Sequence, residues 1–219
     1  MKKWIVEHYA PAPAGHAETW MKFSSNDTWH EYDIEGAIDH SALIAAGLMS
    51  QISPSLPPEW INYPYAVEIG TKVTSIGVSA FYKREGPPSV PSVKLTSVMI
   101  PDSVTSIRDG AFYGCTGLTS VTIPNSVTRI WSRAFAACSG LTSVTIGNSV
   151  TSIWQNAFEN CSSLTSVTIP DSVTVIYPDV FKGCSSLMSM IFLGKTLEQV
   201  QQMAYFSWGI EDTSIINVA

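Results

Sequence analysis

Hydrophobic residues recur along most of this chain with a period of 23 residues. The repeating unit reads C-x-x-L-T-S-V-T-I-P-x-S-V-T-x-I-x-x-x-A-F-x-x, in which apolar positions alternate with Thr, Ser and variable positions. The clearest members of the pattern are Cys115, Cys138, Cys161 and Cys184, together with Phe112, Phe135, Phe158 and Phe181. A fixed period of this length is typical of a solenoid, in which each repeat forms one coil of a stack.

Each repeat predicts two short strands and a turn. The segment 118–123 is rich in β-branched residues that alternate with polar ones, and it ends at Pro124, as a short strand would. A second extended segment spans 127–130, and 134–138 is long enough only for a turn or a single helical or 3₁₀ turn. One coil cannot bury its apolar side chains alone, whereas stacked coils join them into one core. The sequence therefore predicts a β-rich solenoid of short parallel strands, with equivalent residues about 4.8 Å apart.

An earlier and more degenerate copy of the repeat begins at Val67, 31 residues before the matching Val98. The extra residues fall in 83–92, where Gly-Pro-Pro and a further proline indicate a loop that bulges from one coil. The repeat region is therefore expected to cover 67–192, as about five coils with one loop insertion at 83–92.

The pattern LTSVTIP-x-SVT-x-I-x-x-x-AF-x-x-C resembles the BspA-type, or Treponema-type, leucine-rich repeat. It differs from the ordinary leucine-rich repeat, because the Asn position of LxxLxLxxN is missing and a proline follows the strand. The resemblance implies a leucine-rich-repeat solenoid from a bacterial-type surface or secreted protein that serves adhesion and protein binding. It also implies that the repeat itself carries no catalytic residues.

The C-terminal segment, 193–219, is expected to cap the stack, which otherwise leaves an apolar face open at its end. Thr196 and Gln199 fit a capping box that opens a short helix. One face of this helix is expected to hold Leu197, Val200 and Ala204. Trp208 and the apolar residues at 215–218 are expected to add an aromatic lid and a last strand.

The N-terminal segment, 1–66, departs from the repeats in composition and is expected to form a small α+β module that docks on the first coil. Its predicted strands are 3–9, 19–23 and 29–34, with a hairpin turn at 24–27. A helix is predicted over 36–52, because apolar residues recur there at helical spacing and Ser53-Pro54 follows. A proline-rich connector is expected over 54–64.

Composition and charge limit the classes of partner. Charged residues make up only 14% of the chain and hydrophobic ones 45%, so the surface must be polar mainly through uncharged groups. The net charge is -6 and no run of Lys or Arg offers a track for phosphates, which argues against nucleic acid or an anionic membrane as partner. We expect neither a membrane-spanning helix nor an intact signal peptide in this sequence.

The cysteines and histidines are the candidates for metal chemistry, and their spacing does not favour it. Cysteines at a constant spacing of 23 residues line up along a solenoid, whereas tetrahedral zinc needs ligands that converge. They are expected to be buried thiols, and a disulfide would require neighbouring side chains to point at each other. All four histidines lie in 1–66 without an H-E-x-x-H spacing, and no nucleophile or phosphate-binding motif occurs. We therefore expect no catalytic residue, no metal and no cofactor.

The candidate binding residues come from three variable positions between the second Ile of a repeat and its Ala-Phe pair. Freedom to vary indicates exposure, yet the first position holds aromatic residues in three consecutive repeats. Exposed aromatic residues beside Arg, Asn and Asp are typical of surfaces that bind proteins or sugars. The alternative is that these rings lie flat over neighbouring coils as packing. The candidates are Arg108, Trp131, Arg133, Trp154, Asn156, Tyr177 and Asp179.

Two functions remain open from the sequence. The favoured one is a non-enzymatic binding or adhesion module that presents one face of the solenoid to a protein or glycan. The resemblance places such a module outside the cell or on its surface. The alternative is a structural spacer or assembly platform, in which residues 1–66 provide docking or, less readily, a hydrolytic activity.

Overall fold

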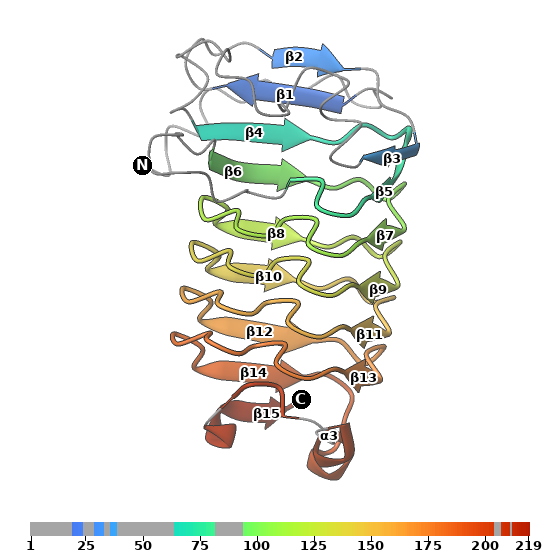
Figure 1. Ribbon diagram of the computed structural model, residues 1–219. Coiled ribbons are helices and arrows are strands. Elements are labelled where there is room, and N and C mark those ends of the chain that lie inside the picture. The colour runs from blue at the N-terminus through green and yellow to red at the C-terminus, as the bar shows by residue number, and fades with distance from the viewer. Residues whose placement is uncertain are drawn as a thin grey trace.

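The structure, a computed structural model, describes residues 19–23, 29–32, 36–38, 64–81, 94–203, 207–210 and 212–219. Successive coils stack along one axis, with one strand on each of two sides of the stack (Figure 1). On one side lie β4 (Pro64–Glu68), β6 (Lys94–Met99), β8 (Ser120–Thr122), β10 (Ser143–Thr145), β12 (Ser166–Ile169), β14 (Ser189–Phe192) and β15 (Ile216–Val218). On the other side lie β3 (Gly36–Ile38), β5 (Val73–Ile76), β7 (Ser106–Ile107), β9 (Arg129–Ile130), β11 (Ser152–Ile153) and β13 (Val175–Ile176). The predicted solenoid of short parallel strands is confirmed.

The strand register follows the sequence repeat, because each residue pairs with its equivalent in the next coil. Val121 lies beside Val144 in β8 and β10, and Ile130 lies beside Ile153 in β9 and β11. The middle residue of β8 points into the core and its neighbours face outward. One sequence pattern therefore produces a continuous apolar core along the whole stack.

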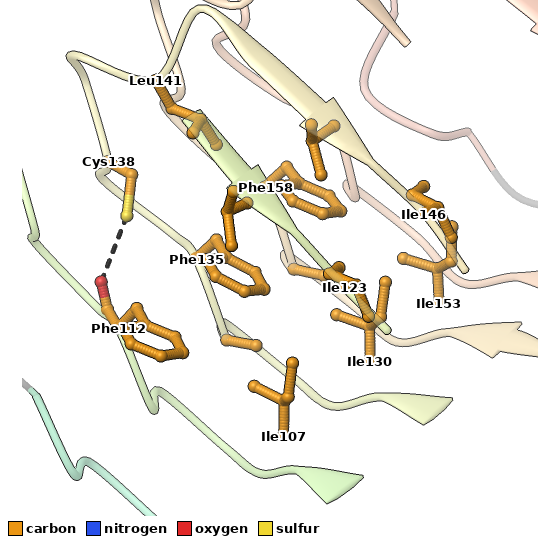
Figure 2. Packing of buried hydrophobic residues seen from close by; sticks show 14 of the residues in the cluster. Ile107, Phe112, Ile123, Ile130, Phe135, Cys138, Leu141, Ile146, Ile153 and Phe158 are labelled. Carbon is orange, nitrogen blue, oxygen red and sulfur yellow. Dashed lines mark hydrogen bonds between the residues drawn. The ribbon is translucent and has the colours of Figure 1, made fainter. Parts of the chain in front are cut away.

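The core contains a ladder of stacked phenylalanines that follows the solenoid axis (Figure 2). Successive ring centroids from Phe81 to Phe181 lie between 5.1 and 5.8 Å apart, and the rings are nearly parallel. The step from Phe81 to Phe112, which spans the predicted insertion at 83–92, has the same 5.1 Å spacing as the step from Phe112 to Phe135. The longer first repeat therefore packs in register with the others.

At the N-terminal end, strands extend both sides of the stack. β1 (Thr19–Phe23) pairs antiparallel with β2 (Trp29–Tyr32) and also with β4, while β3 pairs parallel with β5. The strand predicted over 19–23 is confirmed, and the one over 29–34 is confirmed at 29–32.

The helix predicted over 36–52 is wrong at its first residues, because 36–38 forms β3. Pairing with β5 supplies the hydrogen bonds that a short apolar run cannot make alone, so tertiary context overrides the local pattern. The structure also begins β4 at Pro64, inside the predicted connector, so this strand crosses the predicted boundary between 66 and 67. Outside the described residues lie 3–9, 24–27, 33–34, 39–52, 54–63 and 83–92.

At the C-terminal end, a helix, an aromatic residue and a last strand close the stack, as predicted. In the capping box before α3 (Leu197–Met203), the Gln199 backbone N–H donates to Thr196 Oγ1 at 3.2 Å, and the Thr196 N–H donates to Gln199 Oε1 at 2.8 Å. Val200 is buried, whereas Leu197 is exposed in the first turn; Ala204 lies outside the described residues.

Trp208 forms the predicted lid over the last coil. Its ring packs against Phe192 with centroids 5.6 Å apart, and its carbonyl accepts the backbone N–H of Phe181 at 2.8 Å. A 3₁₀ turn, η2 (Thr213–Ile215), leads into β15, which pairs parallel with β14. The cap therefore satisfies backbone donors that the last coil leaves open.

Candidate functional site

The four residues Arg108, Trp131, Trp154 and Tyr177 form a row across neighbouring coils, which we call the stack surface. Each follows the last residue of a strand, β7, β9, β11 or β13. The backbone N–H of Trp154 donates to the carbonyl of Ile130 at 2.9 Å, and that of Tyr177 donates to Ile153 at 2.9 Å. The sheet ladder therefore continues into this row and fixes the spacing of its side chains.

The aromatic rings of the stack surface lie face to face. The ring centroids of Trp131 and Trp154 are 5.1 Å apart at an interplanar angle of 18°, and those of Trp154 and Tyr177 are 4.7 Å apart at 20°. The guanidinium carbon of Arg108 lies 5.9 Å from the centroid of Trp131, within the range of a cation–π contact. All three rings are half-buried. The rings therefore pack on neighbouring coils and at the same time remain partly exposed.

This geometry determines which part of each ring a partner can reach. The face of Trp154 is covered on both sides by its neighbours, so its accessible atoms belong to the ring edge. Ring edges carry partial positive charge, whereas ring faces carry partial negative charge. A sugar stacks on an open ring face, so the middle of the row is better suited to carbonyl and carboxylate oxygens.

One polar atom within the row lacks a partner among the described residues. Trp154 Nε1 is shielded from solvent and has no hydrogen-bond acceptor. A buried donor left unpaired costs about 1–3 kcal/mol.

Three other candidates, Arg133, Asn156 and Asp179, share a backbone conformation. Their φ angles are 54°, 60° and 57°, in the left-handed region. Gly110 occupies the equivalent position with a φ of 59°, and Asn and Asp tolerate this region better than other side chains. The turn itself explains Asn156 and Asp179. In the sequence, the signal for this turn was the occurrence of Gly, Asn and Asp at the same position of successive repeats.

Arg129 is a residue near the stack surface that the sequence analysis missed. Arg129 is exposed on β9, and Ile130, which lies between it and Trp131, is buried. Alternation along an extended strand therefore places Arg129 and Trp131 on the same outward side. The position before the second Ile also varies between repeats, and that variation was the signal that marked it.

The cysteines are buried thiols, as predicted, and all four are free. Cys138 Sγ donates to the carbonyl oxygen of Phe112 at 3.1 Å (Figure 2), and Cys161 Sγ donates to that of Phe135 at 3.2 Å. Burial raises the pKa of Cys138 to about 12. A hydrogen bond with Cys184, with burial, raises the pKa of Cys161. Cys138 and Cys161 are therefore protonated near neutral pH and serve the core.

Two further features bear on chemistry and location. In the described part of the chain, no group of three or more His, Cys, Asp or Glu residues is arranged to hold a metal ion. None of the described helices is long and apolar enough to span a membrane.

Comparison with known proteins agrees with the repeat geometry. The family described as "BspA type Leucine rich repeat region (6 copies)" matches residues 91–210, more than half of the chain. The chain belongs to this family. The first coil of this BspA-type protein, built from β4 and β5, lies before the matched residues. Its strands nevertheless pair with β6 and β7 of the next coil. A search of curated proteins found no match.

Several solved structures are similar to this BspA-type chain. A leucine-rich repeat protein of T. pallidum is 25% identical with a TM-score of 0.40, over 62% of this chain and 59% of its own. A leucine rich cell surface protein of Faecalibacterium prausnitzii is 25% identical with a TM-score of 0.48, over 84% of this chain and 56% of its own. The pneumococcal vaccine antigen PcpA is 16% identical with a TM-score of 0.49, over 80% of this chain and 48% of its own. This chain thus matches about half of the length of these proteins.

Proposed function

We propose that this BspA-type solenoid is a non-enzymatic module that binds a partner protein through the stack surface, outside the cell or at its surface. The single observation behind this proposal is the row of half-buried aromatic rings, which is held in place by the strand ladder and ends at Arg108. Trp, Tyr and Arg dominate contact energy in protein interfaces, because they bury large areas at low entropic cost. Family membership supports the binding role, and the cell surface relative supports the location.

A protein is favoured over a glycan as the partner. The rings of Trp131 and Trp154 cover each other, so the row offers mainly edges and polar atoms rather than open faces. A rigid row of this kind also loses little conformational freedom on binding, which favours affinity. Arg133, Asn156 and Asp179, which follow the row in the same turns, are proposed to form its rim.

The test is binding of the intact chain to an array that carries both extracellular proteins and glycans. The Trp131→Ala/Trp154→Ala variant is expected to lose the partner while its far-ultraviolet circular dichroism keeps the signal of the stacked coils. Thr122→Ala/Thr145→Ala is the matched control, since these exposed residues lie in β8 and β10 on the other side of the stack. We expect this control to bind like the wild type.

Two results would overturn the proposal. Binding to proteins that the Trp variant retains would remove the stack surface from the site and favour docking through the N-terminal residues. A response confined to neutral glycans, lost in the Trp variant, would keep the surface and replace the class of partner.

A further inference from the structure

The positive charges of this acidic chain are unevenly distributed. The chain has a net charge of -6, and its arginines are Arg84, Arg108, Arg129 and Arg133. Three of these four lie in two neighbouring coils, where 101–145 contains no lysine and only two aspartates, Asp102 and Asp109. The stack surface therefore begins in a locally basic region of an acidic protein.

These three arginines come from positions next to Trp131, either in the preceding coil or within two residues of it in the sequence. Arg108 is one coil away and lies over the ring, Arg129 is on the same outward side of β9, and Arg133 is in the turn that follows. Adjacent coils are about 4.8 Å apart, so the three side chains start within reach of a single ligand segment. An arginine that lies over an aromatic ring is partly ordered before it binds, and its N–H groups stay available to an acceptor.

Among the described residues, no carboxylate forms an ion pair with any of the three guanidinium groups. The ion pairs among the described residues are Lys182 with Asp179 and Lys195 with Asp171, both in later coils. The side chains of Arg108, Arg129 and Arg133 are exposed. Their charge is therefore available to a partner.

The backbone conformation at Arg133 is a second observation that bears on its role. Its φ of 54° lies in the left-handed region, which is unfavourable for arginine and natural for Gly, Asn or Asp. Equivalent positions in other coils hold Ser79, Gly110, Asn156 and Asp179. An arginine kept at a position that suits other residues better is expected where the side chain itself is used.

We infer that the surface around Trp131 binds an acidic segment of a partner protein, with Arg108, Arg129 and Arg133 as the groups that select for carboxylates. The inference rests on the proposed function and names the chemistry of its partner. The planar guanidinium binds a carboxylate through two parallel hydrogen bonds. The positive ring edges of the stack surface add to the same preference. The net negative charge of the rest of the chain repels acidic segments elsewhere and so restricts them to this surface.

The test is a direct titration with two peptides. One is a fluorescein-labelled dodecapeptide that contains Glu and Tyr in equal number, and the other carries Gln in place of every Glu. We expect the wild-type chain to bind the Glu peptide about tenfold more tightly than the Gln peptide, and the affinity to fall as salt rises. Arg108→Gln/Arg129→Gln is expected to weaken binding of the Glu peptide about tenfold and to leave the Gln peptide unaffected.

A matched control separates a local effect from the change in net charge. Ser120→Glu/Ser166→Glu lowers the net charge by the same amount as the double arginine variant, at exposed positions of β8 and β12 on the other side of the stack. We expect this variant to bind the Glu peptide nearly as well as the wild type. Equal loss of affinity in both variants would overturn the inference, since net charge alone would then govern binding.

Three other results would also overturn it. Equal affinity for the two peptides would remove the selection for carboxylates. Binding of heparin that depends on Arg108 and Arg129, without binding of the Glu peptide, would assign the surface to an anionic glycan. Self-association in sedimentation that the arginine variant abolishes, without peptide binding, would assign it to a second copy of this chain.

Failure of this inference can be distinguished from failure of the proposed function. If the array partner is lost in the Trp variant and retained in the Arg108→Gln/Arg129→Gln variant, the stack surface binds a protein and the preference for acidic segments is wrong. If the array partner is retained in both variants, both proposals are wrong.

Discussion

The thiol of Cys138 donates a hydrogen bond to the carbonyl oxygen of Phe112 in the preceding coil, at 3.1 Å. The same carbonyl also accepts the backbone N–H of Cys115 at 3.2 Å, so both of its acceptor sites are used. The thiols of Cys115, Cys161 and Cys184 each donate to the equivalent phenylalanine carbonyl of the preceding coil. This shared hydrogen bond explains why the core position holds Cys rather than Ala or Val. A weak donor of the right size satisfies a buried oxygen while the side chain packs as an apolar group.

The first prediction concerns the dependence of stability on pH. The pKa of Cys138 is raised from 9.0 to about 12 by burial, so between these values the unfolded chain has lost the proton that the native chain keeps. The stabilisation from this thiol is full below pH 9 and falls as pH rises toward 12, by about 1.4 kcal/mol per pH unit. Urea unfolding of the wild type and of Cys138→Ala at several pH values above 9 measures the difference in slope. Identical slopes for the two proteins would contradict the prediction.

The second prediction concerns the reactivity of the cysteines. Thiolates react and thiols do not, and burial both blocks access and keeps Cys138 and Cys161 protonated. The native protein is expected to react slowly with iodoacetamide at neutral pH, and all four cysteines are expected to react once urea unfolds it. Mass spectrometry of the labelled protein counts the modified residues. Rapid modification of Cys138 in the native state would show that the thiol ladder is open to solvent.

The third prediction tests the stacked phenylalanines. Phe135 is fully buried, and its ring lies 5.1 Å from that of Phe112 and 5.4 Å from that of Phe158. Phe135→Ala is expected to lower the free energy of unfolding by about 3–5 kcal/mol, because it removes apolar contacts with both neighbouring coils and leaves a cavity. Phe135→Leu keeps most of the volume and is the control, with a smaller loss expected in the same urea titration. Equal losses would mean that ring volume does not matter at this position.

The sequence predicted the solenoid well because stacking forces equivalent residues to be alike. Ile130 pairs with Ile153, and Val121 with Val144, so the period of the sequence is the register of the sheets. The capping box at Thr196 was also visible, since it depends on two side chains three residues apart. Local and periodic signals of this kind need no knowledge of the rest of the fold.

Other features depended on contacts that the pattern does not contain. The strand β3 exists through its pairing with β5, and its short apolar sequence also fits a helix. The period placed Trp131 and Trp154 in one row, but it does not determine whether rings meet by faces or by edges. Arg129 was missed because its outward orientation depends on where β9 begins. The structure begins β9 at Arg129, whereas the extended segment expected from the sequence began at 127.

The fourth prediction concerns the C-terminal cap. Gly209 has a φ of 79°, and a Cβ atom there would lie 2.6 Å from Cα of Lys182 in the last coil. Gly209→Ala is expected to push the cap away, weaken the contact of Trp208 with Phe192, and cost at least about 1–2 kcal/mol from the left-handed backbone alone. Gly110→Asn is the control, because that position is also left-handed but its Cβ would lie at an ordinary 3.6 Å from Ser79. Thermal unfolding compares the variants. A Tm of Gly209→Ala equal to that of the wild type would mean that the cap does not hold the last coil.

The fifth prediction separates stability from binding at Arg133. Its left-handed backbone is costly for arginine, so Arg133→Asn is expected to stabilise the protein by up to about 1 kcal/mol, or about 2–4 °C in Tm. Ala137→Asn is the control, since Ala137 has a φ of 58° in the same coil and its equivalent in the next coil is Asn160. Both variants should unfold at higher temperature, and only Arg133→Asn should bind the Glu peptide more weakly. If Arg133→Asn gained stability without losing affinity, the side chain of Arg133 would have no part in recognition.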